Sequence, residues 1–216
     1  MNDYVIRMAA YAIMKYKSRN PFDIIEQRKI NFAVTENLVD TLGFYAVVNN
    51  RRFIRLSAYA NEIQLLMGAG HELGHDFCDK SEAAKNGPFQ DTFFYSLDTS
   101  RQERRANIFS AELLIEDKKI LEPCGYYEFQ ELLESETRKH SRSSDQQILF
   151  HTQMEFAVTH DTVTTEMISR EIGLDPVLIE FKYQALKDKG FLLPVEPNLD
   201  SGYLSGLMKK TDENRM

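Results

Sequence analysis

Apolar residues recur along this chain at two kinds of spacing, and each kind predicts a different element. The runs 43–48 and 53–58 are rich in β-branched and aromatic residues, which favours strands. Asn49 and Asn50 separate these runs, and asparagine tolerates the left-handed backbone of a tight turn, so we expect a β-hairpin. Spacings of three and four, or a proline suited to a first helical turn, predict helices over residues 3–18, 21–27, 61–79 and 100–116.

Two stretches interrupt this periodicity. Residues 80–100 lose it and collect aromatic residues, which predicts a long loop or lid. Its aromatic side chains either line the rim of a cleft or cover core, and the sequence does not choose between these. Residues 134–144 are polar and charged, and they indicate a helix end followed by a linker.

These breaks divide the chain into three parts. We expect a first domain over residues 1–135 and a helical module over residues 145–195, with a helix boundary at Gly173. The tail over residues 198–216 is predicted to be disordered.

The helix over residues 61–79 carries the motif His-Glu-x-x-His, formed by His71, Glu72 and His75. Four residues make about one helical turn, so both imidazoles project from the same face, and imidazole nitrogen suits Zn²⁺. Glu72 is rotated from that pair enough to miss a metal and reach a water beside it. This spacing predicts the zinc site of a metalloprotease, with an inert buried pair of histidines as the alternative.

A catalytic zinc usually has three protein ligands and one open position, so a further ligand is required. Our choice is Glu103 in the helix over residues 100–116, with Asn107 on the same face as a candidate to hydrogen-bond one of the ligand side chains. Ser100-x-x-Glu103 is also a capping box, in which Glu103 would bond to backbone and never contact a metal. Glu112 points to about the opposite side and is predicted to be solvated.

Other candidate residues carry less information. Tyr59 or Tyr95 could stabilise an oxyanion, and nothing in the sequence selects between them. The remaining histidines lack ligand spacing among themselves and are interpreted as ordinary polar residues, namely His140, His151 and His160.

Charge limits the classes of partner. The formal net charge of −7 and the pI near 5.3 argue against a surface that binds nucleic acid, because phosphate binding needs clustered lysine and arginine. Residues 161–190 hold six acidic and four basic residues. We therefore expect this segment to pack or to dock a protein partner, and not to bind DNA.

Cysteine use and hydropathy indicate the compartment. Cys78 and Cys124 are too few for a disulfide framework, and Cys78 is interpreted as a reduced packing residue. The first residues lack the pattern of a signal peptide, and no apolar run approaches the roughly 18 residues of a membrane span. The sequence therefore predicts a cytoplasmic protein without a membrane partner.

The run GAGHELGHDF, followed about thirty residues later by ERRANIFSAELL, resembles the ImmA/IrrE family of metallo-endopeptidases. That family combines HExxH with E-x-x-A-N-x-F-A-x-E-L-L, and the resemblance covers about residues 1–120. It implies that Glu72 is catalytic and that zinc is bound by His71, His75 and Glu103. Ser110 stands where the family often has alanine.

This resemblance completes the expected fold and function. We expect an α+β zincin-like domain in which a small sheet packs against the motif helix, followed by a C-terminal helical segment similar to a helix-turn-helix. The implied function is a zinc-dependent endopeptidase that cleaves a helix-turn-helix repressor of a phage or mobile element and so relieves repression. The alternative is a metal-stabilised regulatory protein that acts by binding DNA or protein without proteolysis.

Overall fold

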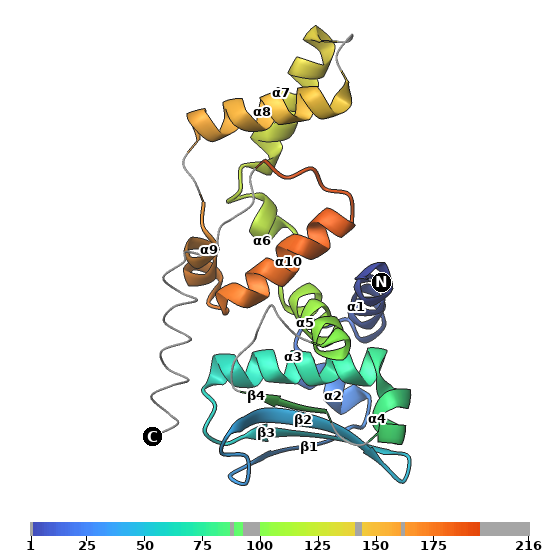
Figure 1. Cartoon of the computed structure of the whole chain (residues 1–216). Helices are drawn as coiled ribbons and strands as arrows, with labels where there is room; N and C mark the ends of the chain where they lie inside the picture. Colours follow the sequence, from blue (N-terminus) through green and yellow to red (C-terminus); the bar gives the residue numbers. More distant parts are fainter. Residues whose placement is uncertain (1, 87–88, 93–99, 141–143, 161–162, 195–216) are drawn as a thin grey trace. The chain divides into compact units, whose positions relative to one another are not determined.

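The computed structural model describes residues 2–86, 89–92, 100–140, 144–160 and 163–194 (Figure 1). The strands are β1 (Asn31–Thr35), β2 (Thr41–Val48), β3 (Arg51–Ser57) and β4 (Phe89–Thr92). The helices are α1 (Asn2–Tyr16), α2 (Pro21–Gln27), α3 (Glu62–Cys78), α4 (Lys80–Asn86), α5 (Arg101–Leu114), α6 (Lys118–Leu121), α7 (Tyr126–Lys139), α8 (Asp145–Thr159), α9 (Thr165–Ile172) and α10 (Pro176–Asp188).

The chain separates into two compact units. The first contains residues 1–116 together with 181–189, and the second contains residues 117–180 and 190–216. Residues 181–189 therefore belong with the first unit, whereas the sequence pattern groups them with the module over residues 145–195. The fold is of the mixed α+β kind that the sequence predicts, with the sheet confined to the first unit among the described residues.

The described strands form a four-stranded sheet in the order β1-β3-β2-β4. β1 runs parallel to β3, and β2 runs antiparallel to both β3 and β4. Asn49 and Asn50 join β2 to β3 with φ angles of 50° and 61°, which confirms the predicted hairpin turn. The face toward α3 is apolar, with Leu42, Ile54 and Leu56 buried.

The predicted long loop over residues 80–100 is wrong in two places. Residues 80–86 form α4, and residues 89–92 form β4, which pairs with β2 at the edge of the sheet. A seven-residue helix and a four-residue strand are too short to show a periodic pattern of apolar residues. Residues 93–99, including Tyr95, lie outside the described residues.

Helix α3 is the centre of the first unit. Asn61 and Gln64 exchange two hydrogen bonds of 2.9 Å, each from a backbone N–H to the other residue's side chain, so a capping box starts the helix. One side of α3 contacts β2 and β3, and another contacts α5 (Figure 1). Residues 67–77 are buried as a result, which explains why this helix has apolar or small residues around most of its circumference.

Glycines in α3 allow α5 to approach at backbone distance. A Cβ atom on Gly74 would lie 2.6 Å from the Cα of Ala106, and one on Gly70 would lie 2.7 Å from Ser110 Oγ. Both distances are shorter than real Cβ contacts. The neighbours of Gly74 are backbone atoms, so this position needs glycine while the helices stay this close, whereas at Gly70 a rotation of the Ser110 hydroxyl could make room. The resulting crossing brings the first turn of α5 beside the histidine motif.

Helix α5 is also fixed at its other end. Arg19 donates hydrogen bonds of 3.0 Å to the backbone carbonyls of Glu112 and Leu113. Lys182 Nζ lies 2.7 Å from Glu112 Oε1, and Lys189 Nζ lies 2.6 Å from Oε2. The expectation that Glu112 is solvated is therefore wrong, because residues 181–189 return to α5 and supply two ammonium groups.

The second unit is helical in its described residues. Phe129 of α7 and Phe156 of α8 are buried against each other with ring centroids 5.5 Å apart. Gly173 ends α9 in a left-handed conformation, with φ of 77°, which confirms the predicted break. The likeness to a helix-turn-helix concerns Phe156, Val158, Val163 and Met167, at the end of α8 and the start of α9, and it stays a prediction. None of the described helices has the length and apolar character to span a membrane.

The close crossing of α3 and α5 can be tested by two matched substitutions in α3. Gly74→Ala places a methyl group against backbone atoms that cannot move aside, whereas Gly68→Ala meets only the side chains of Leu42 and Leu56, at 3.3 Å. Both gain up to about 1 kcal/mol of helix propensity. We expect Gly74→Ala to lower the free energy of unfolding by about 1–3 kcal/mol and Gly68→Ala to change it little, measured by urea denaturation. Equal stability of the two variants would contradict the crossing.

Candidate metal centre and active site

His71 and His75 occupy the same face of α3 and meet at their ring nitrogens. Their side chains are almost fully buried, with exposed fractions of 3% and 0%. Their Nε2 atoms lie 3.1 Å apart, and the rings are arranged edge to face. One helical turn separates the residues, so this geometry follows directly from the spacing of the motif.

Glu103 approaches both histidines from the first turn of α5. Its Oε2 lies 3.2 Å from His71 Nε2, and its Oε1 lies 3.5 Å from His75 Nε2. Ser100 Oγ accepts a hydrogen bond of 3.3 Å from the backbone N–H of Glu103. Ser100 therefore caps the helix through backbone, while the Glu103 carboxylate is directed at the histidines.

These three side chains have the composition and spacing of a zinc site. Among the described residues, His71, His75 and Glu103 are the group whose potential ligand atoms all lie within 4.8 Å of one another. Ligand atoms at ordinary distances from a tetrahedral zinc are roughly 3.3 Å apart. The observed separations of 3.1, 3.2 and 3.5 Å fit this value, and two imidazoles with one carboxylate are a donor set that zinc accepts.

The other nitrogen of each imidazole has its own partner. His71 Nδ1 lies 2.7 Å from Asn107 Oδ1, and His75 Nδ1 lies 3.4 Å from Asp79 Oδ2. An oxygen acceptor at Nδ1 places the ring proton there and leaves the lone pair of Nε2 available. Asn107 was singled out by its place on α5, whereas Asp79 was missed although it lies one turn after His75.

Glu72 is buried on the sheet side of α3, with an exposed fraction of 1%. A Cβ atom on Gly43 of β2 would lie 2.8 Å from Glu72 Oε1 and 2.6 Å from Leu56 Cδ2. The register between β2 and β4 shifts between Thr41 and Gly43. Sequence reasoning missed Gly43, for which the available signal was a glycine inside a strand.

Asp76, next to His75, fixes α3 to the sheet. Its carboxylate accepts hydrogen bonds from Arg28 Nε at 2.7 Å and from Tyr45 Oη at 2.8 Å, and Arg52 lies 3.3 Å away. Burial and the neighbouring Asp76 carboxylate raise the pKa of the Tyr45 hydroxyl, which therefore remains a donor. This network sets the rotation of α3 about its own axis.

Two other residues discussed from the sequence, Tyr59 and Cys78, lie outside the group of potential ligands. Tyr59 lies in the turn before α3 with an exposed side chain, and its role at an oxyanion stays a prediction. Cys78 is partly buried, and burial raises the pKa of its thiol to about 12. Cys78 does not belong to the group of potential ligands formed by His71, His75 and Glu103.

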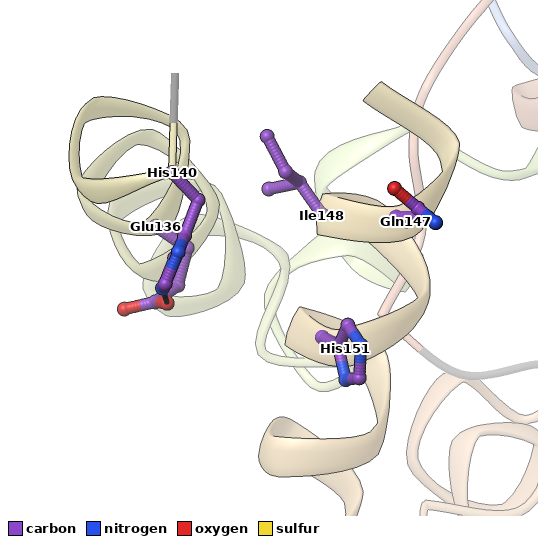
Figure 2. Close-up of a pocket in the computed structure, with 5 residues that line it drawn as sticks. All are labelled: Glu136, His140, Gln147, Ile148 and His151. Atoms are coloured by element: carbon purple, nitrogen blue, oxygen red, sulfur yellow. Dashed lines mark ion pairs between the residues drawn. The ribbon is translucent and has the colours of Figure 1, made fainter. Parts of the chain in front are cut away.

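Two of the remaining histidines face a separate pocket in the second unit. Figure 2 shows His140 at the end of α7 beside Glu136, with His151 across the pocket on α8. Glu136 Oε2 lies 3.4 Å from His140 Nε2, and the cavity has a volume of about 500 Å³. In the described residues these side chains do not bring three potential ligand atoms together, and their interpretation as ordinary polar histidines stays a prediction.

Comparison with known proteins connects this geometry to a family. The chain is similar to "Uncharacterized immunity region protein 2" of Bacillus phage phi105, with 29% identity over 106 residues. The match covers 49% of this chain and 64% of the phage protein, so the chain spans less than two thirds of that relative. No solved structure gives a significant match.

The family match falls on the first unit and the start of the second. Residues 28–134 match the peptidase M78 family, described as the IrrE N-terminal-like domain. This stretch contains both histidines of the motif, Glu72, and Glu103 on the crossing helix. The chain therefore belongs, through residues 28–134, to the IrrE N-terminal-like family of M78 peptidases.

Proposed function

We propose that this protein is a zinc-dependent endopeptidase, with the metal held by His71, His75 and Glu103 and with Glu72 as the catalytic residue. The observation that carries the proposal is the convergence of three potential ligand atoms within 4.8 Å, next to a buried glutamate on the same helix. The family of peptidases to which the chain belongs supports the same reaction.

The expected chemistry is hydrolysis of a peptide bond. Zinc bound at this site would supply Lewis acidity, which makes water more acidic and polarises a carbonyl group. Glu72 acts as the general base that takes a proton from the attacking water, and it returns that proton to the leaving amine nitrogen. Its burial against Gly43 holds the carboxylate in one place, so little reorganisation is needed during the reaction.

The two histidines and Glu103 serve to hold the metal. Asn107 accepts a hydrogen bond from His71 Nδ1, which keeps the Nε2 lone pair directed into the site. Glu103 adds one negative charge to two neutral imidazoles, and this donor set leaves a fourth position for water or substrate.

We further propose that the substrate is a repressor of the helix-turn-helix class encoded by a phage or mobile element. The support is the resemblance described above and the name of the phage relative, which assigns that protein to an immunity region. Cleavage of such a repressor would relieve repression. Co-expression with the product of the neighbouring gene, followed by intact-mass measurement of the fragments, tests the proposal.

The competing function is that of a metal-stabilised regulator that binds DNA or protein without cleaving it. A chain that binds zinc, leaves every candidate repressor intact and shifts a DNA probe with strong salt dependence would favour that alternative. Discrete fragments of the repressor, which disappear when a chelator is present, would favour the peptidase.

Replacement of Glu72 separates catalysis from metal binding. We expect Glu72→Gln to retain about one zinc per chain, because the side chain is assigned to water and not to the metal. Cleavage should fall by at least about 100-fold, since general acid and base catalysis of this kind contributes that much or more. Metal analysis and a cleavage assay measure the two quantities. Loss of zinc together with activity would show that Glu72 is a ligand instead.

Replacement of Glu103 decides between its two possible tasks. If Glu103 is a ligand, Glu103→Gln should weaken zinc affinity by more than about 100-fold. This loss exceeds the one expected from removing a residue that only hydrogen-bonds a ligand. Ser100→Ala should leave zinc affinity nearly unchanged and cost about 0.5–2 kcal/mol of stability through the lost cap. Zinc titration against a competing chelator and thermal unfolding give these values. If both variants keep wild-type zinc affinity, the third ligand is another residue.

A further inference from the structure

Asp79 contacts His75 in two ways at the C-terminal end of α3. Its backbone N–H donates a hydrogen bond of 2.8 Å to the His75 carbonyl, and its Oδ2 lies 3.4 Å from His75 Nδ1. The side chain is fully buried, with an exposed fraction of 0%. A carboxylate in this position requires compensation, because isolated buried charge is costly.

Arg105 of α5 supplies that compensation. Its guanidinium forms an ion pair with Asp79 Oδ1 and lies 3.5 Å from Glu82 Oε1 of α4. A hydrogen bond from Gln102 and the nearby Arg105 hold the pKa of Glu82 below its usual range, so Glu82 stays charged. Arg105 is two residues from Glu103, so one segment of α5 provides both the third potential ligand and the partner of Asp79.

The two oxygens of Asp79 therefore have different tasks. Oδ1 is engaged by Arg105, and Oδ2 faces the ring nitrogen of His75 that does not point at Glu103. A carboxylate at Nδ1 fixes the proton on that nitrogen, orients the ring and makes Nε2 a stronger electron donor. His71 has the neutral amide of Asn107 at the equivalent place, so the two imidazoles are held by groups of different charge.

We propose that Asp79, held by Arg105, is a positioning residue that fixes the orientation and tautomer of His75 and so raises the affinity of the site for zinc. This inference rests on the proposed zinc site, but it concerns metal affinity and not the cleavage reaction. Asp79 acts through His75 and contacts neither metal nor substrate.

Asp76 provides a matched control on the same helix. It is also almost fully buried, with an exposed fraction of 2%, and its carboxylate is also paired with arginines. Its hydrogen-bond partners are Arg28, Arg52 and Tyr45, on the sheet side. Neither His71 nor His75 is among these partners. Loss of a buried carboxylate as such should therefore affect both positions, whereas loss of a contact with His75 should affect only Asp79.

The experiment compares Asp79→Ala, Asp79→Asn and Asp76→Asn with the wild-type chain. Zinc affinity is measured by competition with a chromophoric chelator, and stability of the metal-free chain by urea denaturation. We expect Asp79→Ala to weaken zinc binding about 10–100-fold. Asp79→Asn should lose less, because an amide oxygen can still accept the Nδ1 proton. Asp76→Asn should lower stability while zinc affinity stays within about threefold of wild type.

The outcomes separate this inference from the proposed function. Equal zinc affinity in all four chains, or equal losses at Asp76 and Asp79, would overturn the positioning role. If Asp79→Ala does not fold, Asp79→Asn decides, since wild-type zinc affinity in that variant would also overturn it. A wild-type chain that binds zinc but cleaves nothing would refute the endopeptidase while leaving the role of Asp79 intact. A wild-type chain that binds no zinc would refute both.

Discussion

The near-contact between the backbones of α3 and α5 is the constraint on which the site depends. Two histidines on one helix supply only half of a tetrahedral set, and the third potential ligand comes from another helix. Glu103 lies in the first turn of α5, and its carboxylate lies 3.2 Å from His71 and 3.5 Å from His75 where Gly74 lets Ala106 approach at backbone distance. Metal–ligand distances tolerate only about 0.2 Å of error, which makes the separation of these helices a chemical requirement.

Buried ion pairs add a second constraint, which acts on the rotation of α3 about its axis. A helix that is apolar on several sides has no strong preference for one rotation about its axis, but paired carboxylates impose one. Asp76 ties α3 to arginines on the sheet side, and Asp79 ties it to Arg105 of α5. Both carboxylates lie within a turn of His75, so the same ion pairs that rotate the helix also direct the motif toward Glu103.

Features encoded locally could be predicted from the sequence. The helix over residues 61–79 and the turn at Asn49 and Asn50 depend on neighbouring residues, and both are found close to their predicted positions. Features that depend on a partner far away in the sequence could not be predicted. Glu112 was expected to be solvated because nothing near it in the sequence indicates lysines seventy residues away, and Gly43 gains its meaning only from the Glu72 carboxylate packed against it.

The lysine pair on Glu112 bears on how much of the chain the proposed site needs. The family match stops at residue 134, but Lys182 and Lys189 neutralise a carboxylate in the helix that carries Glu103. A chain cut after residue 134 would keep every proposed catalytic side chain and yet lose both ammonium groups that pair with Glu112. The first unit therefore extends beyond the stretch that matches the family, because residues 181–189 supply the cations that pair with Glu112.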